Sequence, residues 1–506
     1  MADVTNVEDS ISSKASPRAY WALVLLILLL FASIRIRLRD MPLERDEGEY
    51  AYAGQLLLAG IPPYQLAYNM KLPGTYAAYA MVIAVFGETP AAIHWGLLIV
   101  NAATTLLVLL LARRLFGDWP GLVAGATYGL LSTSPTVLGF AGHATQFVVL
   151  PAVGGILSLL SAVELRSKWR IAASGVLLGL AVLMKQPGIA FVLFGAMYLA
   201  YSHPKPRWKS IREIAILFAG AAVPLAITCI LLLRAGVFGK FWFWVFSYGA
   251  QYGSAIRPLN GLLLLIGTLP SVIGANAPIW LVAAAGAFAL IRYRRSEAFF
   301  ALSFLAFSFL AVSAGLYFRN HYFVLLLPAL SILAGAAVTG AKPLPRPLVV
   351  SALALSLLLG SNFLFRMNPS DAARSIYGTN PFPDAMEVAH YLRQHSPAGS
   401  RIAVFGSEPE IYFYSGRRSA TGYIYSYGLM ESQKYAGRMQ EEMAREIERS
   451  EPEYIVYVHC PLSWLRTKQS DPWIFSWADQ YLNARYKLME PQPAGGSRQL
   501  VVYRRL

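Results

Sequence analysis

The chain has 506 residues, of which 56% are hydrophobic and only 14% charged, and its mean hydropathy is +0.47. This composition lies well outside that of soluble globular chains and indicates a polytopic membrane protein. The formal net charge of +15 would by itself allow a nucleic-acid-binding protein. Residues 1–366 carry 27 Lys and Arg against 13 Asp and Glu, so the excess positive charge lies in loops of the hydrophobic part. It does not form a nucleic-acid-binding face.

The first predicted element is a membrane span at 19–37. It follows a polar lead that contains Lys14 and Arg18, and three arginines occupy alternate positions from Arg35 to Arg39 at its end. A cleaved signal peptide would show small residues at a cleavage site after the apolar run, and none are present there. We therefore expect an uncleaved first span.

Eleven runs are predicted to cross the membrane, because about 20 apolar residues are needed for roughly 30 Å of hydrocarbon, with tolerance for shorter buried helices. They are 19–37, 91–112, 120–139, 144–163, 171–186, 188–202, 211–234, 276–292, 297–316, 321–340 and 347–366. With a cytoplasmic N-terminus the basic clusters fall in cytoplasmic loops, as the positive-inside rule requires. These clusters are Arg113/Arg114, Arg166/Lys168/Arg170, Lys205/Arg207/Lys209/Arg212, Arg292/Arg294/Arg295 and Lys342/Arg346. The loop 38–90 and the region 367–506 then lie outside.

Two further apolar segments are not counted as spans. Residues 72–86 are short and are bounded by Pro73 and Gly87, so we expect them to lie flat at the outer interface. Residues 261–276 contain Gly, Pro and Asn, which favours a broken or re-entrant segment packed against protein.

The composition changes after Arg366. Short β-branched and aromatic runs at 400–406 and 453–459 predict strands, and the polar stretch 430–449 predicts a helix. We therefore divide the chain into a transmembrane domain, 1–366, and an extracytoplasmic α/β domain, 367–506. The only two cysteines are Cys229 and Cys460, which provide neither a disulfide framework nor a cysteine metal site.

Carboxylates are concentrated in the first outer loop, where five of the 13 acidic residues before position 367 lie between Asp40 and Glu49. Asp46 followed three residues later by Glu49 has the spacing of a capping box, with a helix over 47–59 and Gly60 at its end. A structural cap therefore explains Asp46. It does not explain Glu47.

The same loop ends in a basic residue next to a predicted helix start. Lys71 stands two residues before Pro73, and proline is favoured in the first turn of a helix. A lysine beside free backbone N–H groups forms an anion site. The alternative is that Lys71 extends to the phosphates of the surrounding lipids.

This order of features resembles the glycosyltransferase C superfamily: an early span, the pair Asp46-Glu47, then Lys71-Leu72-Pro73 opening an interface helix. The chain is most similar to the bacterial branch of the dolichyl-phosphate-mannose protein mannosyltransferase family, which includes relatives of the lipid A aminoarabinose transferase. The resemblance covers roughly residues 15–366. Where relatives have Pro-Pro after the lysine, this chain has Leu72-Pro73, which weakens the inference for Lys71.

The resemblance implies an inverting transfer of one sugar from a polyprenyl-phosphate carrier to a glycan, lipid or protein acceptor at the outer face of the bacterial cytoplasmic (inner) membrane. It implies that Asp46 is the catalytic base and that Glu47 orients the acceptor or the sugar. A leaving lipid phosphate needs fixed cations, for which Lys71 comes first, with Arg257 and Arg319 behind it. The chain has no phosphate-binding glycine loop and no Asp-x-Asp pair for a nucleotide sugar. We expect no tightly bound cofactor and no metal.

Other outer-side residues are weaker candidates. His321, in YFRNHYF at the mouth of the tenth span, is either a site residue, as in relatives, or an interface histidine. Lys185 joins two short spans on the same side, and His143 ends the third span. Eight aromatic residues between 237 and 258 indicate an interface belt or a groove for the isoprenoid tail.

The C-terminal region is predicted to roof the catalytic loop or to select the acceptor, through the segment 405–423 with Glu408, Glu410, Arg417 and Arg418; a solvated connection is the alternative. Two functions of other classes remain open from the residues: a lipid or solute transporter that uses the segment 261–276, and a non-catalytic envelope scaffold. Against transport, the sequence shows no inverted repeat, and its ionisable groups gather at the outer surface.

Overall fold

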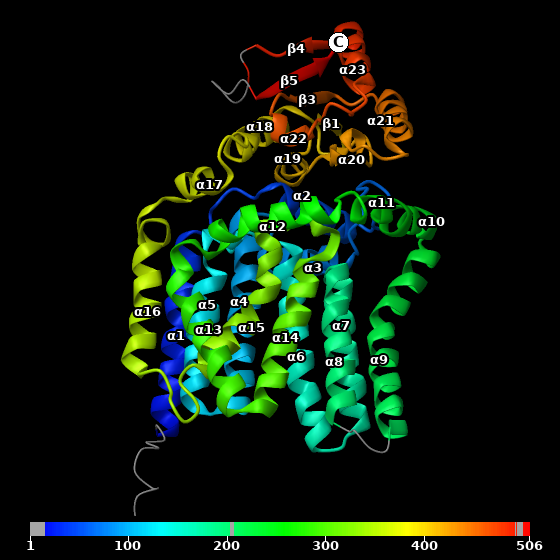
Figure 1. Cartoon of the computed structure of the whole chain (residues 1–506). Helices are drawn as coiled ribbons and strands as arrows, with labels where there is room; N and C mark the ends of the chain where they lie inside the picture. Colours follow the sequence, from blue (N-terminus) through cyan, green and yellow to red (C-terminus); the bar gives the residue numbers. More distant parts are fainter. Residues whose placement is uncertain (1–15, 203–206, 491, 493–498) are drawn as a thin grey trace, which may run out of the picture.

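The computed structural model describes residues 16–202, 207–490, 492 and 499–506. A bundle of helices carries a C-terminal domain of mixed helices and strands on one end, with short helices between the two (Figure 1). Two residues used in the topology prediction, Lys14 and Lys205, lie outside the described residues. The π-helical turn Asn362–Arg366 is the last helical element before the mixed domain.

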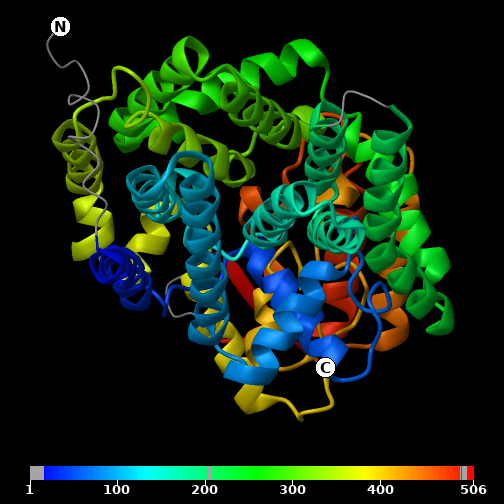
Figure 2. The same cartoon turned by 90° about the horizontal axis from the view of Figure 1, so that it is seen from below.

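A helix of the bundle coincides with each of the eleven predicted spans. These helices are α1 (Pro17–Arg37), α4 (Pro90–Phe116), α5 (Asp118–Ser132), α6 (Ala144–Glu164), α7 (Lys168–Met184), α8 (Ile189–Ser202), α9 (Arg207–Arg234), α13 (Ala277–Tyr293), α14 (Arg295–Val312), α15 (Leu327–Ala336) and α16 (Arg346–Leu359). Figure 2 shows them from the side opposite the C-terminal domain, with the dark blue α1 and the yellow-green α16 toward one edge.

Six helical stretches in the described part of the chain are long and apolar enough to cross a membrane, and three apolar helices are shorter. The outward faces of the bundle are apolar as well. Leu25 and Leu29 of α1, and Leu231 of α9, are each more than half exposed. Water would make such continuous apolar surface costly, whereas lipid tails cover it without penalty. The chain is therefore a multi-pass membrane protein.

Short helices occupy the end of the bundle that faces the C-terminal domain, which is called the outer end after the predicted topology (Figure 1). They are α2 (Arg45–Leu58), α3 (Gly74–Phe86), α10 (Phe238–Trp242), the π-helix Phe243–Tyr248, α11 (Gly249–Gly253) and α12 (Pro258–Ile273). Helix α3 has 13 residues, fewer than the roughly 20 that a span needs on its own, and packs against α2, α4 and α7.

The segment 261–276 is broken only at its end, where the chain turns through Gly274–Asn276 before α13. Helix α12 is continuous from Pro258 to Ile273 and includes Pro270, which lies near its C-terminal end. It lies across the outer end of the bundle (Figure 1), and Leu262 and Leu263 are more than half exposed. A helix lying at the interface needs no break to remain in the membrane, because it does not cross.

The C-terminal domain is built on one five-stranded sheet with the order β2-β1-β3-β5-β4. Its strands are β1 (Arg401–Phe405), β2 (Arg418–Ser419), β3 (Tyr454–Val458), β4 (Tyr486–Leu488) and β5 (Leu500–Arg505). Strand β1 runs parallel to β2 and β3, while β5 is antiparallel to β3 and β4. The two predicted strands are thus confirmed as the central pair, with Val404 opposite Val456.

Seven helices complete this domain: α17 (Pro369–Tyr377), α18 (Phe382–His395), α19 (Glu410–Ser415), α20 (Tyr427–Met430), α21 (Ala436–Ser450), α22 (Pro461–Trp464) and α23 (Trp473–Arg485). The predicted helix at 430–449 is α21. Helix α19 follows β1 and packs directly on α2. A Cβ on Gly48 of α2 would lie 2.5 Å from the backbone N of Glu410, so only glycine allows this approach. The loop after β1 therefore lies against the acidic outer loop.

Candidate active site

Helix α2 begins one residue before Asp46, and its cap differs from the predicted one. Glu44 is the N-cap: its Oε1 accepts from the Glu47 N–H at 2.9 Å, and Glu47 Oε2 accepts from the Glu44 N–H at 3.3 Å. The box predicted for Asp46 and Glu49 was therefore wrong by two positions, because Glu can also occupy the N-cap. Asp46 is left in the first helical turn, where a carboxylate is stabilised by the helix dipole but not consumed as a cap.

The Asp46 carboxylate receives hydrogen bonds from both domains. Its Oδ1 accepts from Lys71 Nζ at 2.9 Å and from the Tyr425 hydroxyl at 2.7 Å. Its Oδ2 lies 3.3 Å from His143 Nδ1. Burial alone would raise the pKa of Asp46, but the Lys71 ammonium and His143 outweigh it and hold that pKa well below its usual range. Asp46 is therefore an anion with one oxygen, Oδ2, only lightly engaged.

Lys71 is a fixed cation between two carboxylates. Its Nζ lies 2.9 Å from Asp46 Oδ1 and 2.7 Å from Glu49 Oε2, and 4.5 Å from the centre of the Tyr50 ring. Burial would lower the pKa of Lys71, but these two carboxylates raise it well above its ordinary value. The Tyr76 hydroxyl donates to the other Glu49 oxygen at 2.7 Å. Lys71 thus neutralises Asp46 and Glu49, and its charge is less available to a phosphate than the sequence indicated.

Glu47 is directed away from this cavity. One of its oxygens accepts from the Gly142 N–H at 2.6 Å and lies 3.3 Å from His94 Nε2, and the other closes the capping box. It ties α2 to the outer ends of α4 and α6. The predicted contact of Glu47 with acceptor or sugar has no support in this geometry, since Glu47 does not line the cavity.

Asp46 opens into a cavity of about 260 Å³ between the bundle and the C-terminal domain. Three cations line it. Lys71 is paired with Asp46 and Glu49, whereas Lys185 and Arg319 form no ion pair with a carboxylate among the residues that the structure describes. Burial lowers the pKa of Lys185 to about 7, with Asp46 opposing and Lys71 and Arg319 reinforcing the shift. Lys185 Nζ stands 4.0 Å from the centre of the Tyr322 ring.

An aromatic wall faces these cations. Trp244, Tyr248 and Tyr252 line the same cavity, and they come from the segment that the sequence presented as a belt or a groove. Tyr248 is buried and donates to Glu431 of the C-terminal domain at 2.6 Å. The structure does not bring Arg257 to the cavity: it is exposed and precedes α12 as its N-cap.

Two stacked histidines lie on the other side of Asp46. The rings of His143 and His321 are 4.0 Å apart and inclined by 11°. One ring nitrogen from each and one oxygen of Asp46 all lie within 4.8 Å of one another, so these three residues form a group, within the part of the chain that the structure describes, that could hold a metal ion. The sequence prediction of metal independence is not tested by this arrangement.

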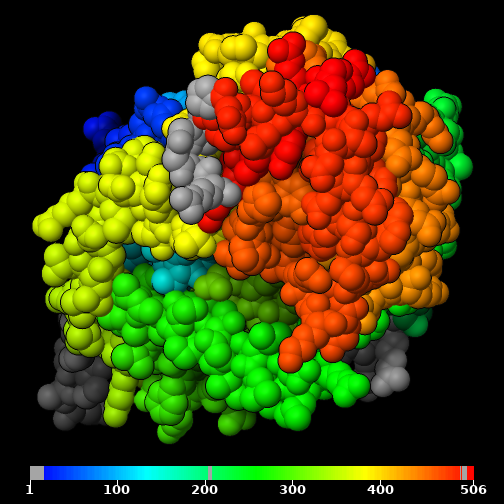
Figure 3. Space-filling view, turned by 90° about the horizontal axis from the view of Figure 1, so that it is seen from above, coloured from blue at the N-terminus to red at the C-terminus, as the bar shows by residue number. Residues whose placement is uncertain are grey.

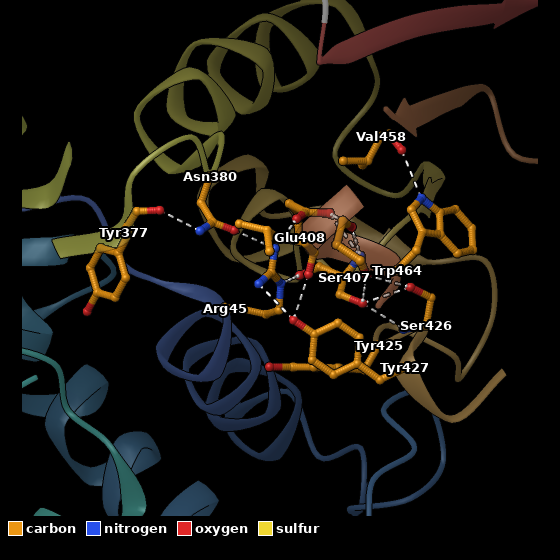
Figure 4. Close-up of polar contacts among 12 residues, drawn as sticks. Arg45, Tyr377, Asn380, Ser407, Glu408, Tyr425, Ser426, Tyr427, Val458 and Trp464 are labelled. Carbon is orange, nitrogen blue, oxygen red and sulfur yellow. Dashed lines mark hydrogen bonds and ion pairs between the residues drawn. The ribbon is translucent and has the colours of Figure 1, made fainter. Parts of the chain in front are cut away.

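The C-terminal domain supplies residues that the sequence did not single out. Tyr425 bonds Asp46, and Arg45, the neighbour of Asp46, enters a buried cluster of that domain (Figure 4). Arg45 Nη2 lies 2.6 Å from Glu408 Oε1, and Arg45 Nη1 donates to the Tyr427 hydroxyl at 2.9 Å. Of the charges predicted to face the site, Glu408 does so through Arg45, while Arg417 bonds to Ser396 away from it.

Comparison with known proteins gives a family and a fold. Residues 71–247 match the sequence model of the family described as dolichyl-phosphate-mannose-protein mannosyltransferase. The match covers about a third of the chain, and this part is similar to that family. The resemblance inferred from the sequence is thereby confirmed, and with it the assignment to the glycosyltransferases. The matched segment begins at Lys71, so Asp46 lies outside it. No curated protein matches the chain.

Solved structures share the fold over nearly the whole length. ArnT from Cupriavidus metallidurans bound to undecaprenyl phosphate is 16% identical, with a TM-score of 0.64 over 96% of this chain and 98% of that one. The apo state of the same protein gives a TM-score of 0.60 at 16% identity, over 97% of this chain and 98% of that one. The archaeal oligosaccharyltransferase AglB from Archaeoglobus fulgidus, in complex with an inhibitory peptide and a dolichol-phosphate, is 13% identical and gives 0.51 over 88% and 70%.

Proposed function

We propose that this protein transfers a single sugar from a polyprenyl-phosphate carrier to an acceptor at the outer face of the bacterial cytoplasmic membrane, with Asp46 as the base. The observation that carries the proposal is the meeting of Asp46 with Lys185 and Arg319 in one cavity whose other wall is aromatic. The family match supports a lipid-phosphate mannose-type donor. The undecaprenyl phosphate held by ArnT and the dolichol-phosphate held by AglB support a polyprenyl carrier.

Asp46 accepts the proton of the acceptor. The acceptor oxygen forms a bond to C1 of the sugar, the bond from C1 to the phosphate oxygen breaks, and the phosphate leaves with the electron pair. A carboxylate with a depressed pKa is a weak base, so the proton moves late, when the attacking oxygen has already become acidic. Asp46 Oδ2 is the oxygen for this step, because Oδ1 already accepts two hydrogen bonds.

Lys185 and Arg319 hold the phosphate of the donor. They line the cavity without carboxylate partners in the described part of the chain, so their charges meet the negative charge that grows as the phosphate leaves. Trp244, Tyr248 and Tyr252 cover the first part of the isoprenoid chain. Lys71 keeps Asp46 ionised and in place, and Glu47 positions α2 by its capping box.

The eleven bundle helices cross the membrane with the N-terminus in the cytoplasm. This topology places the loop with Asp46 and the C-terminal domain on the same, outer side, where the structure has them in contact. It also keeps the arginines at the ends of α1 and α4 on opposite sides, so that those of α4 are cytoplasmic.

The test uses the purified full-length protein in liposomes with polyprenyl-phosphate hexoses and pentoses labelled in the sugar, together with envelope material as acceptor. We expect the wild-type protein to break the carrier–sugar bond and Asp46→Asn to lose roughly 10²- to 10⁴-fold of that rate. Glu47→Gln is the matched control one residue away, and its rate is expected to fall far less. Labelled carrier that changes leaflet with its sugar bond intact, or an Asp46→Asn variant of full activity, would contradict the proposal.

A further inference from the structure

A second cavity, of about 380 Å³, lies on the side of Asp46 away from Lys71 and Lys185. From outside, Figure 3 shows a hollow bordered by the yellow segment that leads into the C-terminal domain, the green segment that contains α12, and the orange part of the C-terminal domain. Cyan atoms, from the part of the chain around α5 and α6, are visible at its floor. The second cavity is lined from these same regions, by Tyr377, Thr268, Tyr425 and Leu138.

The two cavities share one wall. Asp46, Arg319, His321, Tyr425 and Tyr427 line both of them. In a single displacement the attacking oxygen and the leaving phosphate lie on opposite sides of C1, and the base must be within hydrogen-bond reach of the attacking oxygen. If the donor phosphate occupies the first cavity, the acceptor therefore approaches through the second.

The second cavity does not suit an anion. Apart from the shared Arg319, its cation is Arg45, and that charge is already matched by Glu408 at 2.6 Å. Two carboxylates, Glu44 and Asp46, also line it. A phosphate or a carboxylate on the acceptor would meet these like charges, and the one unpaired cation, Arg319, is already engaged by the donor phosphate in the proposed arrangement.

The remaining lining is suited to hydroxyl groups and to the apolar faces of sugar rings. The hydroxyls of Tyr377 and Thr268 form no hydrogen bond with any residue that the structure describes, although both residues line the cavity. The Phe382 ring lies beside Tyr377, with ring centres 5.3 Å apart. Unpaired hydroxyls donate to and accept from sugar hydroxyls, and aromatic rings cover the C–H faces.

We propose that this second cavity is the acceptor site and that it takes a neutral glycan, whose hydroxyl is brought to Asp46 by Tyr377, Thr268 and the Phe382 ring. The inference rests on the proposed transfer function. A segment of protein chain is the other candidate for a hydroxyl acceptor, but the second cavity is a roomy, open hollow lined by rings and single hydroxyls, which fits a branched sugar better than an extended backbone.

The first test is kinetic and compares one chemical change in the two cavities. Tyr377→Phe removes a hydroxyl from the second cavity and Tyr252→Phe removes one from the first. With labelled polyprenyl-phosphate sugar and the glycan fraction of the envelope, we expect Tyr377→Phe to raise the KM for the acceptor about tenfold, the effect of one lost hydrogen bond, without changing the KM for the donor. Tyr252→Phe should change the donor KM instead. A Tyr377→Phe variant that changes only the donor KM overturns the proposal.

The second test identifies the occupant. A benzophenone side chain replaces Phe382 in one variant and Trp244 in another, and both are irradiated in native envelopes. We expect carbohydrate without phosphate attached at position 382 and polyprenyl chains at position 244. A peptide, an anionic lipid or a polyprenyl chain at 382, or no carbohydrate there, overturns the acceptor assignment. Failure of the proposed function is distinct, because then the wild-type protein would consume no donor at all.

Discussion

The two sides of the candidate site offer Asp46 different kinds of partner. The membrane region contributes charge: Lys71 binds Asp46 at 2.9 Å, and Lys185 and Arg319 line the same cavity. The C-terminal domain contributes a neutral hydroxyl, that of Tyr425, at 2.7 Å. The charged partners of Asp46 therefore come from the membrane side, and the C-terminal domain chiefly fixes the position of its carboxylate.

The C-terminal domain holds Asp46 through its neighbour as well. Arg45 is buried, with Glu408 at 2.6 Å, the Tyr427 hydroxyl at 2.9 Å and the Phe382 ring 5.3 Å from its guanidinium carbon (Figure 4). Ser463 donates to the second Glu408 oxygen at 2.5 Å, so both oxygens of this carboxylate are engaged. Because Arg45 and Asp46 are adjacent in α2, this cluster sets the position of the Asp46 carboxylate.

The largest loss of stability and activity is expected when the ion pair between Arg45 of α2 and Glu408 of the C-terminal domain is broken. Glu408→Ala leaves the buried Arg45 charge without its partner, which costs about 3–5 kcal/mol. We expect a lower unfolding temperature in detergent and a loss of transfer. The matched control is Glu387→Ala, an exposed carboxylate on α18, which should change neither. The double variant Arg45→Met, Glu408→Leu should regain stability but not transfer activity. If Glu408→Ala unfolds at the wild-type temperature, the Arg45–Glu408 pair does not stabilise the contact between α2 and the C-terminal domain.

Much of the membrane side could be predicted from the sequence, because its signals are local. Apolar length gave a helix at each of the eleven spans. Asp46, Lys71, Lys185, Arg319 and His321 all lie at or just before helix ends, and the structure brings them together. Arg257 was predicted from the same kind of local signal, an arginine just before a helix, but it lies outside the cavity. Its distance from the site depends on how α12 lies across the bundle, which no local pattern specifies.

The contribution of the C-terminal domain could be predicted only as a possibility. The segment 405–423 was placed near the site, and Glu408 does reach α2, but Tyr425 and Tyr427 stand just beyond it and carry no motif. Their position depends on the pairing of β1 with β3 and on the packing of α19 against α2. The packing of α19 against α2 joins residues more than 350 positions apart, so periodicity and spacing in the chain cannot reveal it.

The second prediction tests the charge of the membrane side. Burial lowers the pKa of Lys185 to about 7 from its usual 10.5, so in the free enzyme its ammonium is present below pH 7 and is lost above it. If this ammonium binds the donor phosphate, kcat/KM for the donor should be level below pH 7 and fall by up to about tenfold per pH unit above it.

Lys185→Arg is the control for this pH dependence, because a guanidinium stays charged over the whole range. In Lys185→Arg, kcat/KM for the donor should remain level above pH 7. In Lys185→Met, kcat/KM should be lower than in the wild type at acidic pH and should not change with pH. A wild-type profile that rises above pH 7, or one that Lys185→Arg leaves unaltered, would remove Lys185 from the phosphate site.

The third prediction tests the C-terminal side by itself. Tyr425→Phe removes the hydroxyl that donates to Asp46 Oδ1, while the ring that fills the cavity wall remains. A hydrogen bond to a charged group contributes about 1.5–3 kcal/mol, so kcat should fall roughly tenfold or more. Because a hydrogen bond to the anion is lost, the pKa of Asp46 should also rise, and the acidic limb of the pH profile should move upward. Tyr503→Phe on β5, remote from α2, is the control.

The smallest effect is expected for Arg257. The sequence pattern predicts that Arg257 binds the donor phosphate, whereas the structure places it outside the cavity. Arg257→Ala should leave the donor KM within about twofold, as for most exposed surface positions, whereas Arg319→Ala removes a cation that lines the cavity and should raise that KM at least tenfold, about 1.4 kcal/mol. Both variants lose one arginine from the outer surface, so general electrostatic attraction to the membrane changes equally. A donor KM that rises equally in both would mean that the phosphate is held by the field of the outer surface and not by the cavity, and the role of Lys185 would have to be reassigned with it.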